Sequence, residues 1–154
     1  MERELSRFLK AQEKDFVHAL SEIKSGRKRS HWMWYIFPQI QGLGFSKTAK
    51  YYAIEDLDEA QRYLQHKILG SRLREITAEL LMLDQNNASE IFGSPDDLKL
   101  QSSMTLFASV DISEEKPFNK VLDKFYNGHF DQKTLNITKI IRNVEFEKVS
   151  KKLK

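Results

Sequence analysis

The sequence has 154 residues, no cysteine, and 25 Lys and Arg residues against 22 Asp and Glu residues, which leaves a formal net charge of +3. The length suits one domain, and the absence of cysteine excludes disulfide frameworks, thiolate zinc sites, iron–sulfur clusters and cysteine nucleophiles. The small net charge excludes the one-sided basicity of a dedicated nucleic-acid-binding protein.

The first predicted element is an amphipathic helix that begins near Leu5 and ends near Ser25 and Gly26. Its apolar residues recur at steps of three and four, which places them on one helical face. They are Leu5, Phe8, Leu9, Phe16, Val17, Leu20 and Ile23. This face predicts a helix that packs against the core.

The next segment, residues 30–44, is the most unusual part of the chain, because it holds both tryptophans and four aromatic residues within six positions. It directly follows a basic run at residues 27–29. Pro38 and the two glycines after it exclude one long helix, so we predict a short helix up to about Phe37 and then a loop. Trp and Tyr combine a large apolar area with a polar tip, and the segment therefore either fills a core or walls a pocket.

Three further helices are predicted between residues 46 and 83. Ser46 can cap the first, and Asp56 or Asp58 can cap the second. Gly70 and the serine after it open a longer helix, whose apolar pattern ends at the polar cluster 84–87. Short helices joined by short turns are therefore expected in this part of the chain.

A clear helix start follows at residues 94–97. Ser94 can accept hydrogen bonds from the first-turn amides, Pro95 suits the first helical position, and two aspartates face the positive end of the helix dipole. The same helix carries an unusual number of small hydroxyl side chains, Ser102, Ser103, Thr105 and Ser109. Such residues either allow another helix to approach closely or line a polar cavity.

Two more helices complete the predicted fold. One begins at about Pro117 and ends at Asn127 and Gly128, and the last follows Asp131. Apolar residues at helical spacing support the last one: Leu135, Ile140, Ile141 and Val144. No stretch repeats the period-two pattern of a sheet. We therefore predict one compact all-α domain over residues 1–154, with about seven helices in orthogonal or bundle-like packing, no substantial sheet, and a basic tail at 150–154 that frays.

Five stretches of this sequence carry a resemblance to a known family. They are residues 30–39, 42–44, 69–73, 91–93 and 97–107. They resemble the signature of a bacterial family called domain of unknown function 1810, some of whose members carry the label calpastatin, which we regard as a misannotation. The resemblance covers roughly residues 5–135 and implies a compact all-helical fold. It implies no activity, ligand or catalytic residue.

The usual catalytic and metal-binding patterns are weak in this chain. The four histidines lie far apart, so we predict no metal site. Ser102 or Ser103, together with His31 and Asp97, supply the residue types of a hydrolytic triad, but whether they converge cannot be read from their spacing, and such trios occur by chance in most proteins. The Gly42-Leu43-Gly44 stretch lacks the third glycine of a dinucleotide-binding fingerprint, so we predict no cofactor. Whether the protein is an enzyme, and which residues would be catalytic, stays open.

The remaining hypothesis is a pocket where the aromatic segment meets the hydroxyl-rich helix. Its candidate residues are Arg27, Arg29, His31, Trp32, Trp34, Gln39, Lys99, Ser102, Ser103 and Thr105. Rings can stack on a base or sugar, basic groups can hold negative charge, and hydroxyls can orient the ligand. In the alternative interpretation, the tryptophans fill the core, Lys99 pairs with Asp97 or another acid, and the serines let helices approach.

The charged start of the chain and the lack of an apolar run of about 18 residues predict a cytoplasmic protein without a membrane partner. We hypothesise that it binds a small anionic or nucleotide-like ligand in an aromatic, hydroxyl-lined pocket. A non-catalytic protein-interaction module is the alternative. A weak nucleic-acid binder, using the basic run, ranks third, and the oligomeric state stays open.

Overall fold

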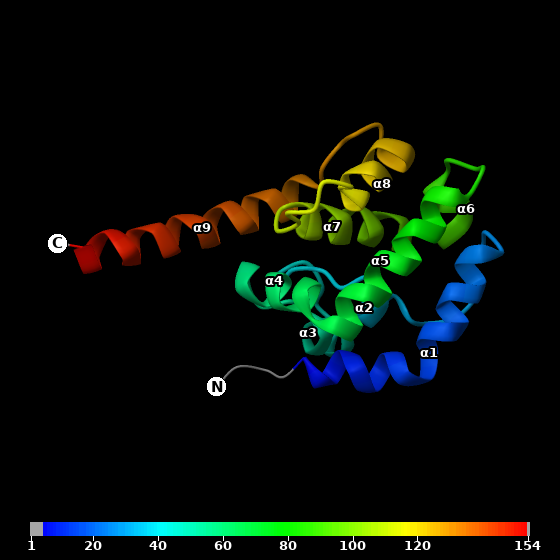
Figure 1. Cartoon of the computed structure of the whole chain (residues 1–154), viewed down its shortest axis with the longest axis horizontal. Coiled ribbons are helices and arrows are strands. Elements are labelled where there is room, and N and C mark those ends of the chain that lie inside the picture. The colour runs from blue at the N-terminus through cyan, green and yellow to red at the C-terminus, as the bar shows by residue number, and fades with distance from the viewer. Residues whose placement is uncertain (1–4, 154) are drawn as a thin grey trace.

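The computed structural model describes residues 5–153, and the side chains of all of these except 141–145 and 152–153. These residues form nine helices (Figure 1). The helices are α1 (Ser6–Lys24), α2 (Met33–Ile36), α3 (Lys47–Tyr52), α4 (Leu57–Gln65), α5 (Lys67–Met82), α6 (Ala88–Phe92), α7 (Asp96–Ala108), α8 (Pro117–Tyr126) and α9 (Gln132–Leu153). The all-α class is confirmed, with slightly more helices than expected. Within the described residues, the only extended pairing is an isolated parallel bridge between Ile40 and Ile54.

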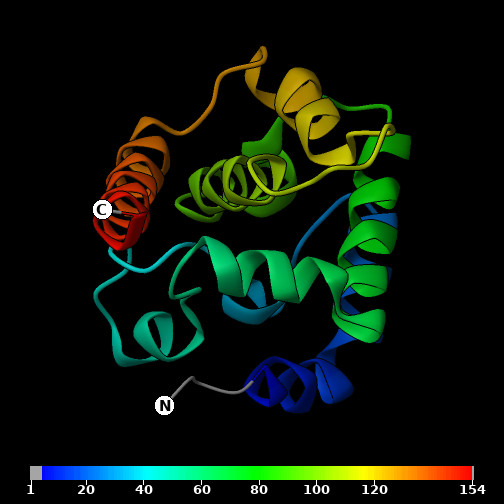
Figure 2. The same ribbon diagram turned by 60° about the vertical axis from the view of Figure 1, so that its left-hand side comes forward.

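Helix α7 occupies the interior of the molecule. Figure 2 shows it with α8, α4 and α9 around it, and α7 contacts each of these three helices. Leu100, Met104, Leu106 and Phe107 are all fully buried, and together they face more than one side of the helix. A helix buried on most sides needs small residues where its neighbours come close, which explains the hydroxyl-rich sequence.

The predicted start of the long middle helix is wrong. Helix α5 begins three residues before Gly70, at Lys67, and His66 caps it by accepting hydrogen bonds from the N–H groups of Ile68 and Leu69 at 3.2 Å each. Gly70 lies inside the helix. The position requires glycine because a Cβ there would come within 2.1 Å of the Leu64 carbonyl oxygen. The glycine therefore serves a close approach between α4 and α5 rather than a helix boundary.

Two further local predictions differ from the structure. Helix α7 has Pro95 at its N-cap position and begins at Asp96, so Ser94 does not cap it, although both aspartates lie in the first turn as expected. The short helix α6 was not predicted, and Asn87 caps it by accepting from the Glu90 N–H at 3.3 Å. Five residues are too few to produce a hydrophobic period that can be recognised in the sequence.

A buried ion pair joins α1 to α4. Arg7 Nη2 donates to Glu59 Oε1 at 2.8 Å and to the Ala53 carbonyl at 2.9 Å, and both charged side chains are buried. Next to it on α1, Gln12 Nε2 donates to the Tyr35 carbonyl at 2.8 Å and to the Tyr63 hydroxyl at 2.9 Å. These contacts anchor the loop region of α2 and α3 on α1, and thereby position the aromatic segment.

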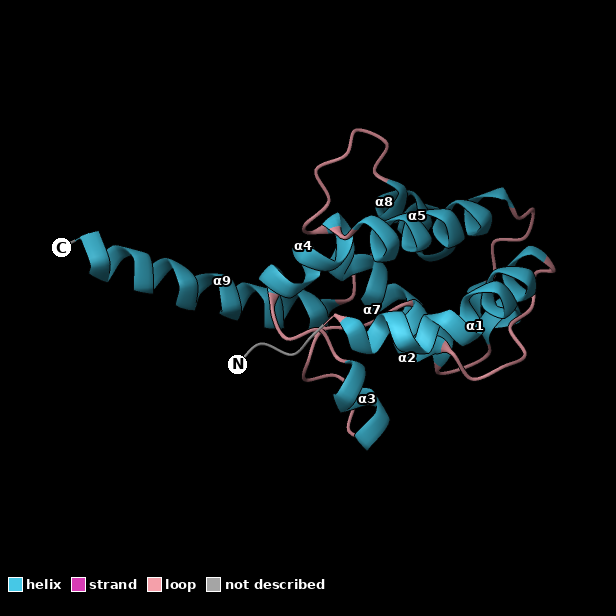
Figure 3. Cartoon of the chain, turned by 60° about the horizontal axis from the view of Figure 1, so that its bottom comes forward, coloured by secondary structure: helices cyan, strands magenta, loops and turns pink. Residues whose placement is uncertain are grey.

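Helix α9 begins on the body of the molecule and then leaves it. Thr134 and Thr138 are buried where the helix packs on α7, and beyond them the helix projects away from the other elements (Figure 3). It continues to Leu153, while Lys154 and the side chains of Ile141 and Val144 lie outside the described residues. Of the helices in residues 5–153, none has the length and apolar content that crossing a membrane requires.

Candidate functional site

The two tryptophans of the aromatic segment have different environments. Trp32 is only 1% exposed, packs near Phe37 and Phe92, and donates from Nε1 to the Glu22 carboxylate at 2.9 Å. Trp34, two positions later, is partly exposed. The core interpretation therefore describes Trp32, and only Trp34 faces a hollow of the surface.

The Glu22 side chain holds the basic run in place by hydrogen bonds to the backbone at the end of that run. Its carboxylate accepts from the N–H groups of Arg29 at 2.7 Å and Ser30 at 3.0 Å, and from the Ser30 hydroxyl at 2.6 Å. Burial alone would raise the pKa of Glu22, but the hydrogen bonds from Ser30, Arg29 and Trp32 outweigh it and lower this pKa to about 2. The side chains of Arg27 and Arg29 are exposed and line neither hollow described below.

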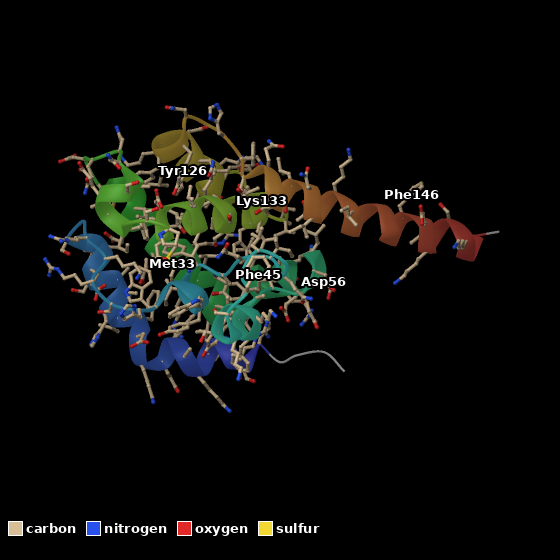
Figure 4. The ribbon with its side chains drawn as sticks, turned by 180° about the vertical axis from the view of Figure 1, so that it is seen from behind. Met33, Phe45, Asp56, Tyr126, Lys133 and Phe146 are labelled. Atoms are coloured by element: carbon tan, nitrogen blue, oxygen red, sulfur yellow. The ribbon has the colours of Figure 1, made fainter. Side chains whose placement is uncertain are left out.

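A hollow of about 710 Å³ lies between residues 39–49, which comprise the loop before α3 and the start of α3, the start of α7 and the start of α9. Its lining residues are Gln39, Leu43, Gly44, Phe45, Ser46, Ala49, Pro95, Leu98, Lys99, Ser102, Asp131, Gln132 and Lys133. We call it the lysine hollow, after Lys99 and Lys133. Phe45 and Lys133, which are labelled in Figure 4, both line it. Three of the candidate residues line it: Gln39, Lys99 and Ser102.

The charges of the lysine hollow are only partly compensated. The Asp131 carboxylate accepts from the Ser102 hydroxyl at 3.2 Å, and from the N–H and hydroxyl of Thr134 at 3.0 and 2.6 Å. These bonds commit Asp131 to capping α9. Lys99 Nζ lies 3.6 Å from Asp96, a carboxylate that also pairs with Lys28 at 3.0 Å. The hollow is thus lined by two lysines, Lys99 and Lys133, and by one carboxylate, that of Asp131, which already accepts three hydrogen bonds.

A second hollow of about 530 Å³ lies between α2 and α3. It is lined by His31, Trp34, Tyr35, Lys47, Thr48, Tyr51 and Tyr52, and we call it the tyrosine hollow. Burial, strengthened by a hydrogen bond to Asp15, raises the pKa of Tyr35 above its usual value, so its hydroxyl stays protonated. This hollow offers aromatic faces and basic groups.

The two hollows meet at one contact. Lys99 Nζ, which lines the lysine hollow, lies 5.7 Å from the centre of the Trp34 ring, which lines the tyrosine hollow. A cation this close to an indole face is attracted by the ring quadrupole. The aromatic segment and the hydroxyl-rich helix therefore come together, and they leave room on both sides of the contact.

Two of the candidate hydroxyls lie away from both hollows. Ser103 is fully buried, and its hydroxyl has no hydrogen-bond partner. Thr105 is also buried, and its hydroxyl donates to the Gln101 carbonyl at 2.8 Å and accepts from the Asp131 N–H at 2.9 Å. Both residues belong to the packing of α7, as the core interpretation expects.

The residue types of a hydrolytic triad are dispersed. Ser102 donates to the Leu98 carbonyl at 3.1 Å and to Asp131, whereas His31 lines the tyrosine hollow. Asp97 accepts from the Ser89 hydroxyl at 2.7 Å. The hydrogen bonds of these side chains therefore run to other partners and do not link serine, histidine and aspartate in sequence.

Sequence reasoning missed Phe45, Asp131 and Lys133 as lining residues. Phe45 is 84% exposed on the loop that follows the two glycines, and an isolated aromatic residue in a loop has no periodic signal. Asp131 was predicted only to precede a helix, and an N-cap aspartate gives no sign of which elements lie beside the helix start. Lys133 comes to the hollow because α9 begins beside α7.

A model of a family of proteins of unknown function, DUF1810, matches residues 2–138 of this chain. The chain belongs to the DUF1810 family. This confirms the resemblance carried by the sequence motifs. No protein with a curated description matches this DUF1810 chain.

The DUF1810 chain is also similar to a solved structure, the crystal structure of the conserved hypothetical protein Rv1873 from Mycobacterium tuberculosis at 1.38 Å. The two share 47% sequence identity and a TM-score of 0.83. The similarity covers 86% of this chain and 94% of the mycobacterial chain. The two proteins therefore share the fold described here.

Proposed function

We propose that this DUF1810 protein is cytoplasmic and binds a small anionic or nucleotide-like ligand in the lysine hollow. The observation that carries the proposal is the position of Lys99, whose ammonium group lies over the Trp34 ring and lines a hollow of about 710 Å³. Pockets of roughly 300–1,000 Å³ are typical of small-molecule sites. The absence of cysteine agrees with a reducing compartment.

The lining residues suggest how such a ligand would be held. Lys99 and Lys133 supply positive charge, while Gln39 and Ser46 supply an amide and a hydroxyl for orientation. Because Asp131 already accepts three hydrogen bonds, it contributes less repulsion toward an anion than a bare carboxylate. A nucleotide would in addition find aromatic faces beyond Lys99, in the tyrosine hollow.

Thermal unfolding tests the proposal, with pyrophosphate and AMP as separate probes. A ligand at one hundred times its Kd stabilises a protein by about 2.7 kcal/mol, which raises the Tm of a chain of this size by several degrees. Lys99→Met should abolish the rise for both probes. This variant should still fold, because Asp96 keeps its ion pair with Lys28.

The matched control is Lys120→Met, an exposed lysine of α8 that lines neither hollow. It should leave the rise in Tm unchanged. Trp34→Ala should reduce the rise for AMP and spare that for pyrophosphate. A Tm that neither probe changes, or a rise that survives Lys99→Met, contradicts ligand binding in the lysine hollow.

A non-catalytic interaction module is the second candidate function. It is favoured by the exposed apolar rim of the lysine hollow, where Phe45 is 84% and Leu98 is 56% exposed. Such a module predicts no gain in Tm with small anions, but a complex in solution that Phe45→Ser removes. The third candidate, weak nucleic-acid binding, rests on the exposed side chains of Arg27 and Arg29, and predicts an affinity that falls steeply with salt.

A further inference from the structure

The positive charge of the chain is concentrated at its end. Residues 139–154, which we call the C-terminal extension, contain six basic and two acidic residues and carry a net charge of +4. The basic residues are Lys139, Arg142, Lys148, Lys151, Lys152 and Lys154. Since the whole chain carries +3, residues 1–138 carry −1. The isoelectric point of the chain, about 9.0, is therefore a property of the extension and not of the folded body.

The C-terminal extension also lies outside the match to the family, which ends at residue 138. Among the residues of α9 whose side chains the structure describes, Thr138 is the last that is buried, and Lys139 and Ile140 after it are exposed. The extension is thus an addition to the shared fold, and the core does not need it for packing.

Residues 139–153 of the C-terminal extension are the distal part of α9, which projects away from the other helices (Figures 1 and 3). Residues 139–153 span about 22 Å at a helical rise of about 1.5 Å per residue. Phe146 is 72% exposed and lies far out on the helix in Figure 4, and Val149 is 56% exposed. An exposed aromatic side chain on a free helix has no role in the stability of the body.

Helical geometry separates these apolar residues from Lys148 and Lys151, whereas Lys152 follows Val149 by three positions and borders the apolar face. Phe146 and Val149 are three positions apart and share one face, and Lys148 and Lys151 share another. Because successive residues rotate by about 100°, the lysine pair lies roughly on the opposite side of the helix from the apolar pair. The distal half of the extension is therefore amphipathic, with an apolar face and a basic face.

We propose that the C-terminal extension docks the protein on an anionic lipid surface. A basic amphipathic helix with an aromatic residue on its apolar face lies in the plane of the lipid headgroups, where apolar side chains leave water and lysines meet phosphates. Clusters of four to eight Lys and Arg residues are drawn to anionic leaflets. The sequence predicted no membrane partner because no segment can span a bilayer, but surface binding needs no spanning segment.

Two other occupants fit the extension less well. A second copy would bring another charge of +4 against the first, which disfavours pairing of two extensions. A nucleic acid would neutralise the lysines but leave Phe146 and Val149 in water. Only a lipid surface satisfies both faces of the helix.

The test is co-sedimentation of the full chain with vesicles of equal parts phosphatidylglycerol and phosphatidylcholine, compared with vesicles of phosphatidylcholine alone. We expect binding to the anionic vesicles that weakens with salt, and at least about ten-fold weaker binding to the neutral ones. Lys148→Gln with Lys151→Gln should weaken binding about twenty-five-fold, at about five-fold for each lysine. Phe146→Ser should weaken it about ten-fold.

The matched controls lie on α1, away from the extension. Lys10→Gln with Lys14→Gln makes the same change in net charge at two exposed lysines, and Val17→Ser removes an equally exposed apolar residue. Neither should change vesicle binding. Equal binding to neutral vesicles, or no binding to either kind, overturns the proposal. So does a loss of binding in the α1 variants as large as in the extension variants, or a dimer in sedimentation that Phe146→Ser dissociates. Binding to duplex DNA that Phe146→Ser leaves intact, without binding to vesicles, would also overturn it in favour of a nucleic acid.

Discussion

The indole nitrogen of Trp32 donates a hydrogen bond to the carboxylate of Glu22 at 2.9 Å. The same carboxylate accepts the N–H groups of Arg29 and Ser30 and the Ser30 hydroxyl, so one side chain near the end of α1 satisfies four donors of the segment that leads to α2. Buried and partly buried polar groups need such partners, because leaving them unpaired costs free energy. Glu22 therefore fixes where the aromatic segment begins.

Glu22→Gln should lower the free energy of unfolding by about 1–2 kcal/mol at neutral pH, since charge-assisted hydrogen bonds become neutral ones. The effect should depend on pH. Folding lowers the pKa of Glu22 from its ordinary 4.5 to about 2, so its charged form stabilises the protein fully above pH 4.5 and progressively less toward pH 2. Urea unfolding of both proteins at several pH values should show their difference shrinking over that window. A difference that is constant down to pH 2 contradicts this role of the carboxylate.

Arg7→Ala should destabilise the protein by about 3–5 kcal/mol, because it leaves the Glu59 carboxylate buried without its ion-pair partner. The comparison is Arg62→Ala, which removes a more exposed arginine paired with Asp58 one helical turn away at 2.8 Å. That change should cost less than about 1 kcal/mol. Equal losses in the two variants, measured by chemical denaturation, would show that burial of the Arg7 pair has no special weight.

Gly70→Ala should destabilise the protein by at least about 2 kcal/mol, although alanine is the better helix former. The added Cβ would lie 2.1 Å from the Leu64 carbonyl oxygen, a backbone atom that can move only if α4 shifts against α5. Ser71→Ala, at the exposed neighbouring position, should change stability by no more than about 0.5 kcal/mol. Thermal unfolding of both variants measures the contrast, and a stabilised Gly70→Ala protein would refute the close approach.

Ser103→Ala should leave the protein equally stable or up to about 1 kcal/mol more stable, because the buried hydroxyl has no partner and its desolvation is not compensated. Thr105→Val, two residues away, should cost about 1–3 kcal/mol, since it leaves the Asp131 N–H without its acceptor. Denaturation curves of the two variants should move in opposite directions or differ by at least about 1 kcal/mol. A clear loss in Ser103→Ala would instead place a ligand or an ordered water at that hydroxyl.

The helical class and several helix ends could be predicted because the signals for them are local. Gly26, with φ of 79°, follows α1 as expected, and Asn127 and Gly128, with φ of 54° and 78°, follow α8. Asp56 caps α4 by accepting from the Glu59 N–H at 2.8 Å. At Gly70 the local signal predicted a helix start, and this was wrong because the glycine is required by a contact with Leu64 of another helix.

The candidate site could be predicted only in outline. The aromatic segment and the hydroxyl-rich helix do meet, at Trp34 and Lys99. Which of their residues line a hollow depends on the rotation of each helix against its neighbours, and the sequence pattern of α7, apolar on several sides, leaves that rotation undetermined. Phe45 and Lys133 come to the same hollow from segments far apart in the chain.

By itself, the sequence determined that the chain is helical, that α1 ends at a glycine and α8 at an Asn-Gly pair, and that the aromatic segment is special, since each of these depends on residues a few positions apart. Only the tertiary structure decided that Trp32 is buried and that Trp34 is partly exposed beside Lys99. The physical reason is that burial is set by the distant partners each side chain meets, here Glu22 and Phe92 for one indole and Lys99 for the other.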